Sequence, residues 1–250
     1  MRVGVLTGLR AEARLLRGAR ADRARAPRVF LTGACSIRAR HEAERLVASG
    51  AIAVVSFGVA GGLDPRLSAG DLVLADRVIF PDGSSVGTDR TWVRAVWARL
   101  RYPSTNVFVG PIAGTDHLIA TAAEKRQLAE RSGALAGDME SAAAAAVAAA
   151  AGLPLLVVRA VSDAASQALP SVARLPVRAD GRLSIGPIAH ALCAHPSEWR
   201  DVARLALGTR AALASLRGVV RAGALLPPGS AFDGVANDPL EHELRGTLAA

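Results

Sequence analysis

Three acidic residues stand at positions where carboxylates carry out acid–base chemistry in α/β enzymes. Glu12 follows the first apolar run of the chain, Glu140 stands at the start of an alanine-rich stretch, and Asp163 directly follows a long apolar run. Open α/β sheets place their sites at the carboxyl ends of strands and at the helix starts that follow. The three residues together therefore predict a site for general acid–base catalysis. Each residue alone also fits a structural role, as a solvated residue of a first helical turn, a partner of a helix dipole or a helix cap.

A glycine-rich segment, residues 58–63 (GVAGGL), follows a continuous apolar run. Glycines let the main chain approach a ligand closely, and exposed backbone N–H groups bind phosphate, water or a purine. The segment is not the G-x-G-x-x-G fingerprint of dinucleotide-binding proteins. It predicts a turn whose backbone contacts a ligand, and by itself it does not identify that ligand.

The chain carries three short motifs: residues 58–63 (GVAGGL), 138–141 (DMES) and 158–163 (VRAVSD). Their order and spacing resemble those of the nucleoside phosphorylase and methylthioadenosine/adenosylhomocysteine nucleosidase superfamily. The similarity extends from Met1 to about Asp163. Residues 175–221 are more similar to the hopanoid-associated branch, whose enzymes are proposed to remove adenine from adenosylhopane. The resemblance implies a single α/β/α domain with a mixed central sheet, and cleavage of the N-glycosidic bond of an adenine nucleoside.

The resemblance also implies a role for each carboxylate. Asp163 resembles the acid that protonates purine N7, and Ser162 resembles the residue that supports it. Glu140 is similar to the carboxylate that accepts hydrogen bonds from the ribose hydroxyls, and Met139 to the apolar platform beneath the sugar. Glu12 is similar to the base that activates water in the hydrolytic branch. These roles suit the chemistry, because breaking an N-glycosidic bond develops positive charge on the sugar and negative charge on the purine.

Further residues complete the implied site. The backbone of Val59, Ala60 and Gly61 is expected to face the ligand, and Val59 replaces the small polar residue common at its position in nucleosidases. His117 stands where related nucleosidases have an aromatic residue that stacks on adenine; it also fits the role of an ordinary loop histidine. Arg159 resembles a cation behind the site that orients the carboxylates. An adjacent arginine is expected to lower the pKa of such a carboxyl group and keep it ionised.

The sequence leaves hydrolysis and phosphorolysis open. Phosphorolytic relatives hold phosphate with arginines near the first loop, where Gly8 and Arg10 stand. Hydrolytic relatives keep the glutamate that Glu12 supplies, and this carboxylate would repel a phosphate dianion. Inorganic phosphate is thus a possible co-substrate. No other cofactor is predicted, and no metal, because the histidines lack ligand spacing.

Other functions compete with this interpretation. Residues 83–87 (GSSVG) match the G-x-S-x-G pattern of serine hydrolases, with Ser85 as nucleophile and Asp163 and either His190 or His195 completing the triad. A nucleophile elbow needs a strand before it and a helix at once after it, and the residues around this segment instead favour a turn. The three motifs also fit a methylthioadenosine/adenosylhomocysteine-type nucleosidase, or a purine-binding module without activity.

Short β-branched runs alternate with helical patterns, as in parallel βαβ units. Strands are expected at residues 3–6, 29–31, 52–57, 72–74, 107–109 and 155–161, and helices at residues 10–17, 37–49, 92–100, 120–132, 138–151 and 199–221. The glycine-rich segment is expected to form a turn and residues 82–90 a polar loop.

The helix expected at residues 199–221 has an apolar and a basic side at 100° per residue. The apolar arc comprises Val202, Leu205, Leu213, Leu216, Val219 and Val220. The basic side comprises Arg200, Arg204, Arg210, Arg217 and Arg221. The arc is expected to pack on the sheet. The arginines, or the apolar residues 224–228, could instead contact anionic lipid at the inner face of the membrane.

The composition suits one domain. A chain of 250 residues that is 51% hydrophobic can bury one large core. We expect a phosphorylase-like domain over residues 1–222 and a partly disordered tail over 223–250. The net charge of +8 comes from scattered arginines, with Lys125 as the only lysine, and no nucleic-acid module is visible. Without a signal peptide or a membrane span, a cytoplasmic protein is expected, and the resemblance implies a small-molecule nucleoside substrate and a homo-oligomer.

Overall fold

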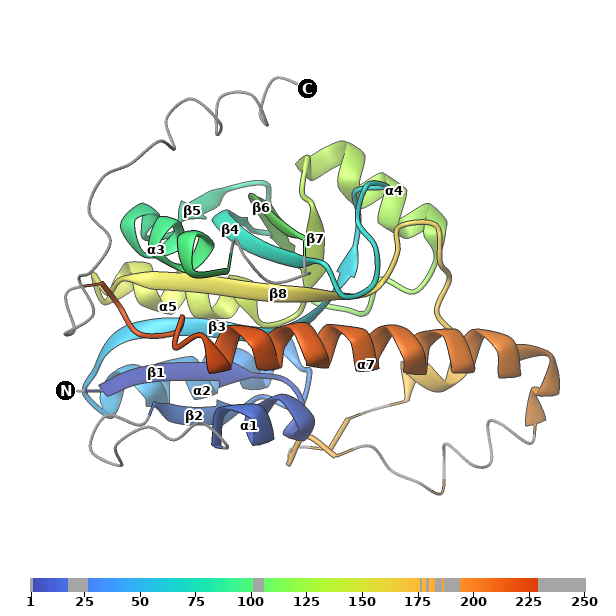
Figure 1. Ribbon diagram of the computed structural model, residues 1–250, viewed down its shortest axis with the longest axis horizontal. Helices are drawn as coiled ribbons and strands as arrows, with labels where there is room; N and C mark the ends of the chain where they lie inside the picture. The colour runs from blue at the N-terminus through green and yellow to red at the C-terminus, as the bar shows by residue number, and fades with distance from the viewer. Residues whose placement is uncertain are drawn as a thin grey trace.

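The chain folds into a single α/β/α domain with a mixed central sheet, as predicted. The computed structural model describes residues 2–17, 27–100, 106–175, 177–178, 180–182, 186 and 194–228. Within these residues, one eight-stranded sheet is covered by helices on both faces (Figure 1).

The sheet runs in the order β2-β1-β3-β7-β6-β4-β5, and β8 pairs with both β3 and β4. The strands are β1 (Arg2–Thr7), β2 (Arg28–Leu31), β3 (Ala51–Gly62), β4 (Leu72–Ile79), β5 (Ser85–Gly87), β6 (Val107–Gly114), β7 (Ala136–Asp138) and β8 (Leu155–Asp163). Strand β3 runs parallel to β1 and β8 and antiparallel to the short β7, whereas β4 is antiparallel to β8 and β5. The carboxyl ends of β1, β3 and β8 therefore meet at one edge of the sheet, where α/β proteins place their sites.

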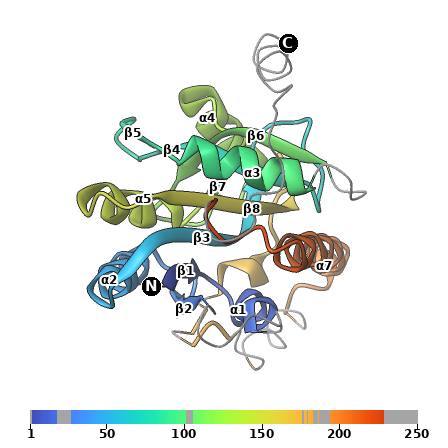
Figure 2. The same ribbon diagram turned by 60° about the vertical axis from the view of Figure 1, so that its left-hand side comes forward.

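The helices form two layers. They are α1 (Arg10–Arg17), α2 (Ser36–Ala48), α3 (Arg90–Leu100), α4 (Ala122–Ser132), α5 (Ser141–Ala150) and α7 (Trp199–Arg221), with short 3-10 helices η1 (Ser171–Arg174) and η2 (Pro196–Glu198). Helices α1, α3 and α7 share one hydrophobic core, and α2 and α5 share another on the opposite face of the sheet (Figure 2). Helix α4 packs through Leu128 and Ala129 against a small cluster that includes Ile79 of β4 and Ala113 of β6.

Strand β8 lies at the centre of both layers, and all of its nine residues are buried. Val158 and Ala160 face the layer of α7, whereas Val157 and Val161 face the layer of α5. A strand covered on both faces reads as a continuous apolar run, which is why its position could be predicted. Its end delivers Ser162 and Asp163 to the edge of the sheet.

Two loop predictions were wrong. Residues 58–63 were expected to turn, but β3 continues to Gly62 because β8 runs beside it and pairs Gly58 with Arg159 and Gly61 with Asp163. Residues 85–87 form β5, an edge strand antiparallel to β4. Ser85 is exposed within that strand, and the next helix begins only at Arg90, so the segment is not a nucleophile elbow.

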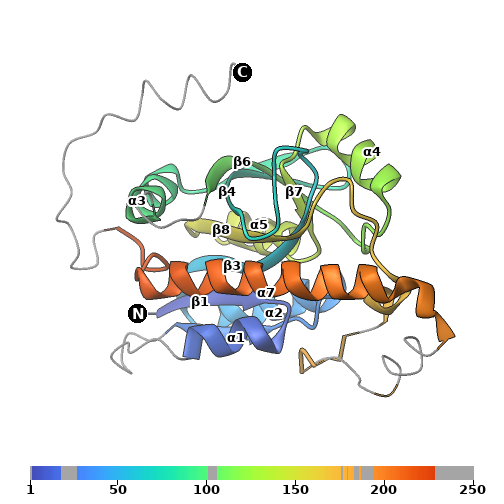
Figure 3. The same ribbon diagram turned by 45° about the vertical axis from the view of Figure 1, so that its right-hand side comes forward.

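Helix α7 lies alongside β8 and α1 (Figure 3), with the bounds that the sequence predicts. Ala224 and Leu225, beyond the expected domain boundary at residue 222, are buried in the core. They are therefore not available for the lipid contact considered for residues 224–228. Residues 229–250, Met1, His190 and Cys193 lie outside the described residues. No helix within the described ranges is long and apolar enough to span a membrane.

Candidate active site

A cavity of about 950 Å³ opens at the carboxyl ends of β1, β3 and β8. The three predicted carboxylates, Glu12, Glu140 and Asp163, all line it. Each side chain is nearly inaccessible to solvent. Three carboxylates from different parts of the chain therefore share one cavity, an arrangement that suits acid–base chemistry.

Glu12 is held by the ends of β1 and β3. Its Oε2 accepts hydrogen bonds from Thr7 Oγ1 at 2.6 Å and from the backbone N–H of Leu9 at 2.7 Å. Its Oε1 accepts one bond, from the backbone N–H of Val59 at 2.8 Å. An ionised carboxylate has about four acceptor positions, so Oε1 retains capacity for a water molecule.

Glu140 lies at the start of α5 beside a buried arginine. Arg159 Nη2 is 3.4 Å from Glu140 Oε2, and Arg159 Nε is 3.0 Å from Asp138 Oδ2. Arg159 also donates to Ser56 Oγ at 2.6 Å, which fixes the guanidinium between β3 and α5. Arg159 thus lies behind the cavity and orients its carboxylates, in the position that the resemblance implies.

Two glycines provide room for these carboxylates. A Cβ atom at Gly8 would lie 2.7 Å from Glu140 Oε1. A Cβ atom at Gly58 would lie 2.7 Å from Arg159 Nη1 and 2.8 Å from Glu12 Oε1. Side chains at these two positions would displace the charged groups, so the glycines serve the packing of the site and not only a backbone contact with ligand.

The prediction that an adjacent arginine lowers the pKa of the carboxyl groups and keeps them ionised was wrong for Glu140 and Glu12. Burial raises the pKa of Glu140 to about 8, even though Arg159 opposes the shift, and the nearby Asp138 and Glu12 raise it further. Burial also raises the pKa of Glu12, against the lowering effects of its hydrogen bonds with Thr7 and Leu9. Desolvation exceeds the attraction of a single guanidinium because one cation faces three buried carboxyl groups.

Asp163 is held from both sides. Ser162 Oγ donates to Asp163 Oδ1 at 2.5 Å, in the supporting position that the resemblance implies. Lys125 Nζ, from α4, lies 2.5 Å from Asp163 Oδ2. Lys125 is fully buried. The carboxyl group is thus fixed at the cavity wall by one polar and one charged partner.

The remaining predicted residues divide into two groups. Six of them line the cavity with the carboxylates: Gly8, Val59, Ala60, Gly61, His117 and Met139. Arg10 does not line it. The Arg10 guanidinium instead lies 3.9 Å from Asp180 Oδ2, and the Arg10 backbone N–H donates to the carbonyl of Gly181. The chain around residues 180–181 therefore draws this arginine away from the carboxylates.

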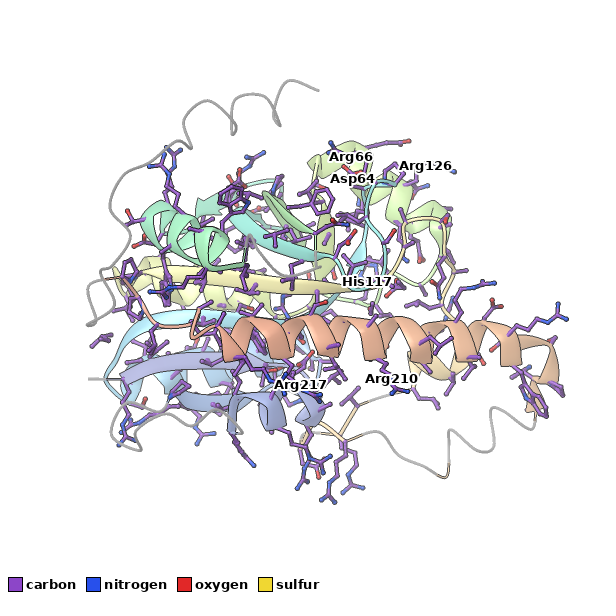
Figure 4. The ribbon with its side chains drawn as sticks, viewed as in Figure 1. Asp64, Arg66, His117, Arg126, Arg210 and Arg217 are labelled. Carbon is purple, nitrogen blue, oxygen red and sulfur yellow. The ribbon has the colours of Figure 1, made fainter. Side chains whose placement is uncertain are left out.

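Helix α7 supplies a wall of the cavity that the sequence analysis did not anticipate. Val202, Leu205 and Leu213, expected on the arc that packs on the sheet, line the cavity, whereas Leu216 and Val219 pack in the core. Leu9, Leu169 and Val172 add apolar surface. Two of the predicted basic residues, Arg210 and Arg217, also line the cavity from α7 (Figure 4).

The geometry can support cleavage of a polar bond between the carboxylates. Glu12 is a buried base with an oxygen able to bind water, Glu140 can accept hydrogen bonds, and Asp163 is fixed at the cavity wall. Lys125 was missed by the sequence analysis. Its only signal was that it is the sole lysine of a chain that otherwise uses arginine for its cations.

Comparison with known proteins shows which family the chain matches and which solved structures share its fold. Residues 29–179 match the phosphorylase superfamily. The fold is similar to a methylthioadenosine/S-adenosylhomocysteine nucleosidase from Neisseria meningitidis, solved with methylthio-immucillin-A, at a TM-score of 0.66 and 19% identity over 90% of this chain and 99% of that one. It is similar to the nucleosidase from S. pneumoniae at a TM-score of 0.62 and 20% identity, over 89% and 99% of the chains.

The fold is also similar to futalosine hydrolase of Helicobacter pylori, at a TM-score of 0.64 and 18% identity over 88% of this chain and 97% of that one. No curated protein matches the sequence. The family match covers most of the sheet and the motifs around the cavity, and the solved structures share the fold. The chain belongs to the phosphorylase superfamily.

Proposed function

We propose that this protein hydrolyses the N-glycosidic bond of an adenine nucleoside that carries a large apolar 5′ substituent, such as adenosylhopane. The observation that carries the proposal is one cavity in which Glu12, Glu140 and Asp163 lie beside an apolar wall from α7. The solved structures with similar folds include nucleosidases bound to nucleoside analogues, which supports a nucleoside as the substrate class.

The proposed reaction uses each carboxylate once. Asp163 gives a proton to purine N7, the C1′–N9 electron pair moves to the purine, and positive charge develops on the ribosyl group. Glu140 binds the ribose hydroxyls, with Met139 against the sugar. Glu12 takes a proton from the water that attacks C1′. Solvent then reprotonates Asp163 and accepts the proton held by Glu12, so the cycle balances.

Hydrolysis is favoured over phosphorolysis by the position of Arg10. This arginine, the expected phosphate ligand, is paired with Asp180 and does not line the cavity. Glu12 occupies the loop instead, and a buried carboxylate there would repel a phosphate dianion. The raised pKa of Glu12 also suits a base that must accept a proton near neutral pH.

Phosphorolysis is the second candidate, because Arg210 and Arg217 line the cavity. Neither makes an ion pair within the described part of the chain. Arginine binds phosphate oxygens in a bidentate manner. If phosphate is the nucleophile, Arg210→Gln or Arg217→Gln should raise the KM for phosphate without changing the KM for the nucleoside.

The α7 wall supports the large 5′ substituent. Leu205, Leu213 and Val172 present carbon surface to the same space as the carboxylates, and apolar surface removed from water contributes about 25 cal/mol per Å². Methylthioadenosine would cover only part of such a wall. A large polycyclic group would cover much more of it.

The test is to incubate the protein with adenosine, methylthioadenosine and adenosylhopane, with and without saturating phosphate, and to measure adenine and the sugar product. We expect the highest kcat/KM with adenosylhopane and free sugar even with phosphate present. Sugar 1-phosphate as the product would contradict hydrolysis, and no adenine from any of the three would contradict nucleoside cleavage.

The substrate preference has its own matched pair of variants. Leu205→Asn should raise the KM for adenosylhopane at least about tenfold more than the KM for adenosine, because it places an amide in the apolar wall. Leu207→Asn is the control, since Leu207 is 67% exposed and does not line the cavity. Equal effects of both variants would contradict the assignment of α7 to the 5′ substituent.

A further inference from the structure

Lys125 makes contacts that account for its whole hydrogen-bonding capacity. Its Nζ lies 2.5 Å from Asp163 Oδ2, 2.8 Å from the carbonyl oxygen of Ala164 and 2.9 Å from that of Gln167. An ammonium group has three N–H donors and no acceptor. Three acceptors therefore surround a protonated lysine, and none of its donors is left to contact a substrate directly.

The surroundings fix this lysine in place. Lys125 lies in α4, whose start is held by a capping box between Thr121 and Glu124. Its side chain passes close to the end of β3, where a Cβ atom at Gly61 would lie 3.8 Å from Lys125 Cε and 3.3 Å from Asp163 Oδ2. The guanidinium of arginine is larger and planar, and it would not match three acceptors around one nitrogen. This accounts for a lysine in a chain that otherwise uses only arginine.

The donors around Asp163 are oriented to bind its ionised form. Oδ1 accepts from Ser162 and Oδ2 accepts from Lys125, so both oxygens are placed as the acceptors of a carboxylate. Donors already aimed at the place where charge develops stabilise a transition state without reorganisation. The charge that develops at this position is the one left when Asp163 loses a proton.

We propose that Lys125 is a positioning residue that orients Asp163 and stabilises the negative charge that forms on it as the purine is protonated. The inference rests on the proposed function. In that step the O–H bond of Asp163 breaks, the N7–H bond of the purine forms, and the carboxylate that remains is the anion that Lys125 and Ser162 bind. Lys125 keeps its own protons throughout.

The first test is Lys125→Met, which removes the charge and keeps an unbranched chain. We expect kcat for adenine release to fall at least about tenfold, part of the effect typical of a general acid, with a change in the KM for the nucleoside below about threefold. The matched control is Arg126→Met, which removes an exposed cation from the neighbouring position of α4 (Figure 4). It should keep kcat within about twofold.

A double-mutant cycle separates positioning from a structural role. If Lys125 acts through Asp163, Lys125→Met should lower kcat by less than about twofold in a protein that already carries Asp163→Asn. A structural role would lower kcat by the same factor in both backgrounds, and that result would overturn the inference. A wild-type kcat for Lys125→Met would overturn it equally.

Lys125→Met leaves a buried carboxylate without its cation, so folding needs a second variant. Lys125→Gln retains N–H donors for the carbonyls of Ala164 and Gln167 but carries no charge. We expect this variant to fold, as a melting transition would show, and to lose as much kcat as Lys125→Met. Wild-type kcat in a folded Lys125→Gln would contradict the inference. Failure of the wild type to release adenine from any nucleoside would instead contradict the proposed function.

Discussion

The residues around Arg159 place more acidic than basic groups in the protein interior. Glu12, Asp138 and Glu140 are buried within one network, and Arg159 is the cation that contacts two of them. Burial therefore raises the pKa of Glu140 to about 8, so its folded-state value lies well above the value of 4.5 for an exposed glutamate. Burying more carboxyl groups than cations lowers the stability of the fold, and it gives the site carboxyl groups that can exchange protons near neutral pH.

The raised pKa predicts a pH-dependent effect of Glu140→Gln on stability. Folded Glu140 retains its proton up to about pH 8, whereas the unfolded chain loses it near pH 4.5. The wild type therefore loses stability as pH rises through this window. Glu140→Gln, which stays neutral, should melt close to the wild type at about pH 5 and several degrees above it at about pH 9, since 1 kcal/mol corresponds to about 2–4 °C for a domain of this size.

Differential scanning fluorimetry at a series of pH values measures this effect. Glu130→Gln, at an exposed position of α4, is the control and should follow the wild type at every pH. A Glu140→Gln melting temperature that stays below the wild type at the alkaline end of the series would show that the ion pair with Arg159 outweighs burial.

At the residue scale, the sequence located most of the cavity but not its charge balance. Glu12, Glu140 and Asp163 could be found because strand ends and helix starts are visible in the apolar pattern. Lys125 could not, since nothing local to α4 indicates which residue reaches 38 positions along the chain to Asp163. The ion pair of Arg10 with Asp180 was hidden for the same reason.

At the scale of elements, the apolar side of α7 serves both the core and the cavity. Ala212, Leu216 and Val219 pack on the sheet, and Val202, Leu205 and Leu213 line the cavity. The helical periodicity predicted its length and its apolar side. It could not show that half of that side faces a ligand space, because cavity walls and core packing use the same residue types.

Gly208 determines how closely α7 approaches the site. A Cβ atom at this position would lie 2.1 Å from the carbonyl oxygen of Ser162, which adjoins Asp163. Gly208→Ala should therefore shift α7, lower the free energy of unfolding by about 1–3 kcal/mol and reduce adenine release.

Gly218→Ala is the matched control on the same helix. Its Cβ atom would meet nothing within 4 Å, so the higher helix propensity of alanine should leave stability unchanged or raise it by up to about 1 kcal/mol. Thermal melting of both variants decides the point. Equal melting temperatures for Gly208→Ala and the wild type would contradict the tight contact.

At the scale of the whole molecule, a net charge of +8 favours contact with anionic surfaces. Arg200 and Arg204 are exposed at the start of α7, where Arg204 pairs with Asp201 at 3.0 Å. Arg210 and Arg217 line the cavity and are also exposed, as is Arg221, so the predicted basic side of α7 is accessible. A nucleoside with a membrane-resident tail would be drawn from such a surface.

This arrangement predicts salt-sensitive binding to lipid. The protein should sediment with anionic liposomes at low salt and be released at high salt, and Arg200→Gln/Arg204→Gln should weaken binding about tenfold or more, since each basic residue near an anionic surface contributes about 1 kcal/mol. Equal, negligible sedimentation with anionic and neutral liposomes would limit α7 to packing and to the wall of the cavity.

The most direct test of N-glycosidic cleavage by these carboxylates is the rate of adenine release by Asp163→Asn beside the wild type. The amide keeps the shape of the side chain but cannot protonate purine N7. We predict a loss in kcat of about 10² to 10⁴, with a melting transition that shows a folded protein. A folded Asp163→Asn that releases adenine within about tenfold of the wild-type rate would contradict the account.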